Sequence, residues 1–296
     1  MTIICGDASG FALSALHGYS LANRHLVRMV RGGVVRATPG RPGKVAVVVG
    51  GGSGHYPAFN GYVGAGFADA AVAGDIFASP STQAIHAVAR RAERGGGVIL
   101  GFGNYAGDVL NFGIAAERLR EAGIDTRLLA TTDDVASAEA ADAARRRGVA
   151  GDLAVFKIVG AAAEAGLDID AVEAIGQRAN RQTRTFGVAF DGCTLPGDHD
   201  RLFHVPPNRM ALGLGVHGEP GVDEQDIPTP AQLAHILFDR VVAELPDDAP
   251  RRVAIILNGL GSTTPEELFV LWEALFPLLA RAGLHVIAPL VGEYVT

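Results

Sequence analysis

A run of β-branched residues that ends in glycines constrains the fold of this chain more than any other stretch. Residues 44–50 read KVAVVVG, with no helical period, which is typical of a strand buried on both faces. Two similar runs follow at residues 96–103 and 126–131, and a helix is predicted before each of them. Alternating strands and helices predict an α/β fold with a parallel sheet and right-handed crossovers.

Capping residues place the ends of these helices. Ser81 or Thr82 is suited to the N-cap of the first helix, which ends before a run of glycines. The second helix is amphipathic, spans residues 107–123 and starts near Asp108. A further helix is expected after Thr229, which is also a preferred N-cap residue.

The second half of the chain repeats the alternation after a helical, alanine-rich stretch at residues 133–179. A strand is predicted at residues 183–190, and a strand that ends in a loop at residues 210–221. A strand, a helix and a strand follow from residues 251, 264 and 285. We place a domain boundary near residue 183. The prediction is two α/β domains, 1–183 and 184–296, with mostly parallel sheets flanked by helices.

The glycine loop after the first strand, GGGSGHYP, does not match the known phosphate loops. No lysine follows the glycines, as a P-loop requires, and the last glycine of a dinucleotide fingerprint is missing. A nucleophile elbow fails because His55 stands where its second glycine belongs. The loop still lets a ligand approach the backbone closely. Pro57 suits the first turn of a following helix, whose amides would face an oxygen-rich ligand. The alternative is a tight turn whose His55 packs locally.

Two further polar residues follow predicted strands. Asp108 lies at a strand-to-helix junction, where it is either an N-cap or a functional carboxylate. His217 lies between small residues, and we expect it to be accessible and to pack little. The carboxyl ends of strands line the ligand crevice of an open α/β sheet, so these two residues and His55 are expected to meet there. Such a cluster suits acid–base chemistry, nucleophilic chemistry or a metal ion, and spacing alone does not separate these.

Composition excludes several classes of protein. The net charge is −7 with no basic block, which argues against a nucleic-acid partner. The two cysteines, Cys5 and Cys193, fit neither a disulfide framework nor a zinc site. No apolar run reaches the roughly 20 residues that span a bilayer, and the N-terminus does not read as a signal peptide. We therefore expect a soluble, cytoplasmic protein that does not bind membranes.

Several motifs in one order resemble the substrate-binding K domain of dihydroxyacetone kinases. They are GGGSGHYP, AGDIFASPS, GNYAGDVLNFG, RRGVAGDLAVFKIVGAAAEAGLD, GCTLPG, GLGVHGEPG and NGLGSTTPEEL. The similarity runs from about Gly33 to the end of the chain. No single motif is specific, but their shared order is.

The resemblance implies a role for each candidate residue. His217 attacks the ketone carbon of a small ketose and holds it as a covalent hemiaminal. Asp108 is the general base beside the terminal hydroxyl, and His55 hydrogen-bonds the adduct and donates a proton. The loop residues Gly52, Ser53 and Gly54 lie beside the substrate, so the glycine loop holds a sugar and not a nucleotide.

The resemblance also implies partners. ATP and Mg²⁺ belong to a separate helical L domain, fused or on another subunit, so no metal or cofactor is expected on this chain. Either ATP or a phosphotransferase relay supplies the phosphoryl group. A homodimer is expected. The competing hypotheses are a ketose-binding or regulatory protein that catalyses nothing, and a His/Asp metal hydrolase.

The chain departs from the family pattern in two places. Tyr56 stands where the pattern has Glu, and Gly103 stands where it has Lys. The loss of both charges predicts a larger ketose such as the tetrose erythrulose, the alternative being that the triose is still preferred. The family also continues past Thr296 with a strand-forming segment. We therefore expect a truncated second domain, or a fragment of a fused kinase, with an exposed sheet edge.

Overall fold

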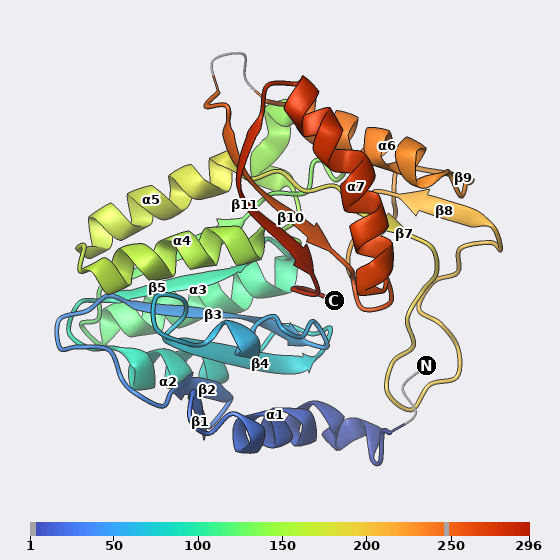
Figure 1. The fold of residues 1–296 in the computed structure, drawn as a ribbon. Helices are drawn as coiled ribbons and strands as arrows, with labels where there is room; N and C mark the ends of the chain where they lie inside the picture. Colours follow the sequence, from blue (N-terminus) through green and yellow to red (C-terminus); the bar gives the residue numbers. More distant parts are fainter. Residues whose placement is uncertain (1–3, 246–248) are drawn as a thin grey trace.

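The computed structural model describes residues 4–245 and 249–296, and it confirms a mixed α/β fold (Figure 1). Six strands form the main sheet in the order β1-β2-β4-β3-β5-β6. Four of them, β4, β3, β5 and β6, run parallel, whereas β1 and β2 extend one edge in antiparallel fashion. The strands are β1 (Val27–Val30), β2 (Gly33–Arg36), β3 (Ala46–Ser53), β4 (Ala70–Ile76), β5 (Val98–Gly103) and β6 (Thr126–Thr131).

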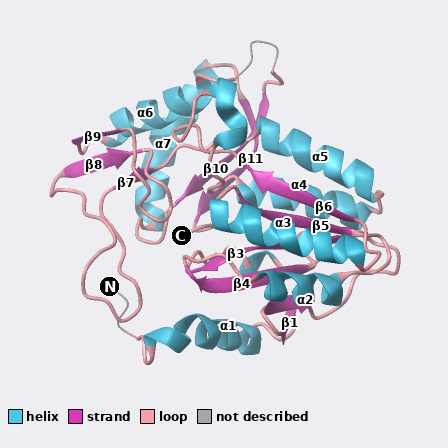
Figure 2. Cartoon of the chain, turned by 180° about the vertical axis from the view of Figure 1, so that it is seen from behind, coloured by secondary structure: helices cyan, strands magenta, loops and turns pink. Residues whose placement is uncertain are grey.

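Helices cover both faces of this sheet because alternate residues of a buried strand point to opposite sides. In β3, Val47 and Val49 pack in the core formed with α4 and α5, whereas Ala46 and Val48 pack in the core formed with α2 and α3. Figure 2 shows α2 and α3 over the face that is turned away in Figure 1. The helices are α1 (Phe11–Ala22), α2 (Thr82–Ala92), α3 (Ala106–Glu121), α4 (Asp152–Ala165) and α5 (Ile169–Gln182).

The residues after 183 build two smaller sheets. β10 (Arg252–Asn258) and β11 (His285–Gly292) are parallel, and they pack with α6 (Pro230–Val242) and α7 (Pro265–Arg281). The other sheet, β7 (Val188–Ala189), β8 (Arg209–Leu212) and β9 (Asp223–Asp226), is antiparallel. Its strands are shorter than predicted. β8 stops before Gly213, whose φ of +71° leaves the extended region.

Most helix starts agree with the sequence, and Asp108 is the exception. The side chains of Ser81 and Thr229 cap α2 and α6 as expected. Tyr105 occupies the N-cap of α3, so Asp108 lies inside the first turn and the N-cap interpretation of this residue is wrong. Its carboxyl group is therefore not used to cap the helix.

The end of the described chain returns to the main sheet. Val295 is buried in the same core as Val47 and Val49, and the hydroxyl of Tyr62 donates to the backbone oxygen of Tyr294 over 2.8 Å. The boundary near residue 183 stays a prediction, since these contacts join the two predicted domains. Within the described ranges, no helix is long and apolar enough to cross a membrane.

Candidate functional site

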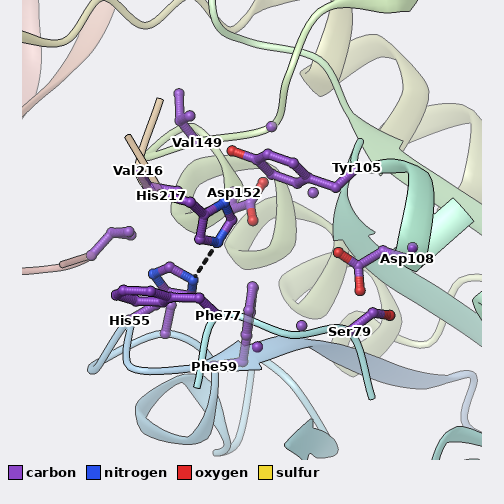
Figure 3. A pocket seen from close by; sticks show the side chains of 17 residues that line it. His55, Phe59, Phe77, Ser79, Tyr105, Asp108, Val149, Asp152, Val216 and His217 are labelled. Carbon is purple, nitrogen blue, oxygen red and sulfur yellow. Dashed lines mark hydrogen bonds between the residues drawn. The ribbon is translucent and has the colours of Figure 1, made fainter. Parts of the chain in front are cut away.

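A pocket of about 200 Å³ lies where β3 and β5 end (Figure 3). The glycine loop after β3 contributes Gly52 and His55, and the start of α3 contributes Asp108. His217 comes from the loop after β8, in the second half of the chain. The structure therefore brings the three predicted side chains into one pocket, although His217 does not follow a strand of the main sheet.

The two imidazoles contact each other directly. His55 Nε2 lies 2.9 Å from His217 Nε2. On their outer sides, His55 Nδ1 is 2.8 Å from the backbone oxygen of Thr296, and His217 Nδ1 is 2.8 Å from Oε1 of Glu219. Every ring nitrogen of the pair thus has a partner within the protein.

These partners fix where the protons are. The Thr296 oxygen and the Glu219 carboxylate accept hydrogen bonds, so Nδ1 of both rings carries a proton. A hydrogen bond between the two Nε2 atoms then needs one more proton.

Two pKa shifts describe the groups around this contact. Burial lowers the pKa of His55 to about 4, so the neutral form of this ring is favoured. Burial tends to raise the pKa of Glu219, but hydrogen bonds from His217 outweigh it and hold the pKa at about 2. An ionised carboxylate accepts a hydrogen bond from Nδ1 of His217, and Nε2 is the nitrogen that faces His55.

His217 is packed rather than free, contrary to the sequence-based expectation. Its side chain is 24% exposed, and its ring meets those of Tyr105, Phe77 and His55 in edge-to-face contacts at 5.0, 5.3 and 4.8 Å. Packing holds the imidazole in one orientation.

Asp108 lies on another side of the pocket (Figure 3). Its residue is 8% exposed and its Oδ1 has no hydrogen-bond partner among the described residues. Burial raises the pKa of this carboxyl, and a hydrogen bond with Ser79 opposes the rise. A buried carboxyl with a raised pKa is suited to proton transfer near neutral pH.

Tyr105 and Asp152 also line the pocket, and sequence reasoning missed both. The Tyr105 hydroxyl is buried without a hydrogen-bond partner among the described residues. Burial, followed by the charge of Asp133, raises the pKa of Asp152 well above its ordinary range. Burial also raises the pKa of Tyr105, so both groups stay neutral.

Not every predicted loop residue faces the pocket. Ser53 and Gly54 are absent from its lining, and Ser53 Oγ instead donates to the backbone oxygen of Gly74 over 2.7 Å. Gly54 has a φ of +103°, and a Cβ there would come within 2.7 Å of the Phe77 ring. These two residues shape the loop that carries His55.

The region around Pro57 also differs from the expectation. No helix begins there, because residues 56–59 form a turn that buries Phe59 in the core, and a 3₁₀ turn, η2 (Asn60–Tyr62), follows. Tyr56 is 56% exposed and contacts Tyr19, away from the pocket. Of the two departures from the family pattern, only Gly103 lines the pocket.

Sequence reasoning also missed the hydrogen-bond partners of the two histidines, Glu219 and Thr296. Glu219 lies only two residues after His217, so an acidic partner at that spacing was a readable signal. Thr296 lies 241 residues from His55, and nothing local connects them. In residues 4–245 and 249–296, no group of three His, Cys, Asp or Glu side chains is placed to hold a metal ion.

Comparisons with known proteins support the motif resemblance. Residues 17–296 match the family described as the Dak1 domain, starting earlier than the motifs do. A D-erythrulose kinase of Mycolicibacterium smegmatis is 55% identical over 296 residues, covering 100% of this chain and 51% of that protein. This chain thus spans about half the length of the first curated relatives that it matches.

Two solved structures share the fold. The dihydroxyacetone kinase from C. freundii, in complex with AMP-PNP and Mg²⁺, matches with a TM-score of 0.89 at 33% identity. That match covers 100% of this chain and 55% of the other. The dihydroxyacetone kinase operon co-activator DhaQ also matches with a TM-score of 0.89, at 31% identity, covering 96% of this chain and 87% of the other.

Proposed function

The chain belongs to the Dak1 domain family, and we propose that it is the ketose-binding part of a ketose kinase. In this proposal, the pocket captures a short-chain ketose and presents its terminal hydroxyl for phosphorylation. The observation that carries the proposal is the 2.9 Å contact between His55 and His217, in a pocket that also holds the buried carboxyl of Asp108.

The capture step uses both imidazoles. The Nε2 lone pair of His217 forms a bond to the ketone carbon, and the π electrons of the carbonyl move to its oxygen. That oxygen takes the proton that the two Nε2 atoms shared, through His55. His217 then carries the positive charge as a substituted imidazolium, and the Glu219 carboxylate balances it. Because the pKa of His55 is about 4, its protonated form is a strong proton donor.

Asp108 has the second role. It accepts the proton of the terminal hydroxyl as the phosphoryl group arrives, for which its unpartnered Oδ1 is available. The rest of phosphoryl transfer is positioning and charge stabilisation. The nucleotide and Mg²⁺ belong to a separate helical L domain or subunit, and the relative solved with AMP-PNP and Mg²⁺ is longer than this chain. A homodimer is part of the proposal.

A four-carbon ketose is the proposed substrate. The relative named as a D-erythrulose kinase is 55% identical, whereas the dihydroxyacetone kinase from C. freundii is 33% identical. Gly103 at the pocket wall bears on sugar size, because a Cβ there would lie 3.2 Å from the ring of Tyr105, which also lines the pocket. A covalent bond to the carbonyl carbon also excludes polyols, which lack that carbon.

A second candidate is a ketose sensor without catalysis, since the co-activator DhaQ shares the fold. The two candidates differ in turnover. Phosphorylation of the ketose in the presence of a nucleotide-binding L partner supports the kinase. Capture of the ketose without turnover, with every L partner tried, supports the sensor.

Carbon NMR of a ketose labelled at its carbonyl carbon tests the capture. We expect the ketone signal to be replaced by that of a tetrahedral carbon with the unmodified protein and not with His217→Ala. Unlabelled erythrulose should displace labelled dihydroxyacetone. A ketone signal that persists with the unmodified protein contradicts covalent capture.

A further inference from the structure

One end of the pocket is built around two glycines, and we call it the Gly103 end. It comprises Gly103, Tyr105, Gly148 and Asp152, which all line the pocket. A Cβ on Gly103 would lie 3.1 Å from the backbone oxygen of Gly148 and 3.2 Å from the Tyr105 ring. A Cβ on Gly148 would lie 2.6 Å from the Cα of Gly103. The two backbones therefore approach each other here without side chains between them.

The polar groups of the Gly103 end are not fully used by the protein. Tyr105 Oη is buried and has no hydrogen-bond partner among the described residues. Asp152 is 4% exposed, and its Oδ1 contacts the hydroxyl of Thr131. That hydroxyl donates to Oδ1 of Asp152, so the proton of a neutral Asp152 lies on its other carboxyl oxygen.

The second carboxyl oxygen of Asp152 is then a donor on a pocket-lining residue. Figure 3 shows Tyr105 and Asp152 on the side of the pocket away from Ser79 and Phe59. One carboxyl group that donates and one phenol oxygen that accepts together match a single hydroxyl group, which both donates and accepts. Both groups are neutral, so they suit a neutral hydroxyl better than a phosphate or a carboxylate.

We propose that the Gly103 end binds the additional hydroxyl-bearing carbon of a four-carbon 2-ketose, with Tyr105 and Asp152 as partners of its hydroxyl. This inference rests on the proposed function. The shared carbonyl carbon is held at His217 and the hydroxyl to be phosphorylated lies at Asp108, so the extra carbon takes the remaining end of the pocket. A triose leaves Tyr105 Oη unpaired, and a buried polar group without a partner disfavours the smaller sugar.

The experiment compares two sugars in each variant. The dissociation constants of erythrulose and dihydroxyacetone are measured from the tetrahedral-carbon signal, and selectivity is the triose constant divided by the tetrose constant. Tyr105→Phe keeps the ring against His217 and removes only the hydroxyl, so we expect selectivity to fall about tenfold. Gly103→Ala adds a methyl group at the same end and should also lower selectivity.

Gly113→Ala is the matched control. Like Gly103→Ala, it replaces a glycine by alanine, but in α3 and at a position where a Cβ meets no atom within 4 Å. Selectivity in this variant should equal that of the unmodified protein. If both sugars form adducts and neither variant changes selectivity, the inference is wrong and the proposed function stands. If the unmodified protein forms no adduct with either sugar, the proposed function fails and the inference fails with it.

Discussion

The two sides of the pocket differ in how the protein treats their polar groups. At the histidine end, formed by His55, His217, Glu219 and the Thr296 oxygen, every ring nitrogen is hydrogen-bonded within the chain. On the other side, Tyr105 Oη and Asp108 Oδ1 are buried without partners among the described residues. The first end is already organised for bond formation, whereas the second is complete only when a ligand supplies hydroxyl groups.

The difference has an energetic meaning. A buried polar group without a partner costs roughly 1–3 kcal/mol. A ligand whose hydroxyl groups match Tyr105 Oη and Asp108 Oδ1 provides partners for both groups. The histidine end gains less from hydrogen bonding to a ligand, so in the proposed mechanism its contribution to affinity is the covalent bond.

Asp108→Asn separates the two sides most clearly. We expect phosphorylation to fall about 10²–10⁴-fold, the usual range for loss of a general base, while the adduct at His217 still forms. Turnover is measured with the nucleotide-binding L partner present, and the adduct by carbon NMR in the same preparation. Equal losses in turnover and in adduct would show that the two sides are not independent.

The pH dependence of stability should differ in sign between the sides. The pKa of His55 falls from 6.5 to about 4 on folding, so the unfolded chain binds more protons between these values and stability is lost as pH falls through that window. The loss amounts to about 3 kcal/mol. The pKa of Asp152 is raised on folding, so above the ordinary carboxyl range the folded chain binds more protons than the unfolded chain. The contribution of Asp152 to the free energy of unfolding therefore falls as pH rises.

Urea unfolding from pH 4 to pH 8 checks both signs. His55→Asn should flatten the decline below pH 6.5, and Asp152→Asn should flatten the decline at higher pH. The unmodified protein is the reference at each pH, so that groups common to all three proteins cancel. The same slope in His55→Asn and in the unmodified protein below pH 6.5 would rule out the assignment for the histidine end.

Glu219→Gln tests the histidine end alone, and the change expected in ketose affinity is the smallest of the three effects. The amide oxygen still accepts from Nδ1 of His217, but the negative charge that balances the imidazolium is lost. A charge-assisted hydrogen bond is roughly twice as strong as a neutral one, so ketose affinity should fall about tenfold. Titration of the labelled ketose measures it, and Glu224→Gln on the exposed strand β9 is the control. Unchanged affinity in Glu219→Gln would mean that Glu219 does not stabilise the adduct.

The sequence predicted the parts of the fold that local rules govern. The β-branched runs became β3, β5 and β6, and Ser81 and Thr229 cap their helices. The candidate residues His55, Asp108 and His217 were found because each follows a strand, and they line one pocket. Their chemical roles stay predictions.

What the sequence could not predict depends on distant packing. The antiparallel edge strands β1 and β2 escaped notice because short strands carry little periodicity. Tyr105 and Asp152 carry no motif that marks a polar group facing a pocket. Pro57 was expected to start a helix, but burial of Phe59 in the core overrides that local preference.

The contact between His55 and Thr296 sets a condition on protein synthesis. A ribosome adds roughly 5–20 residues per second, so His55 emerges about 12–48 s before the residue 241 positions later that accepts its Nδ1 proton. Until then the imidazole pair lacks its outer anchor, and Val295 is not yet in the core. A nascent chain therefore completes the anchored imidazole pair only when the segment around residues 294–296 has docked.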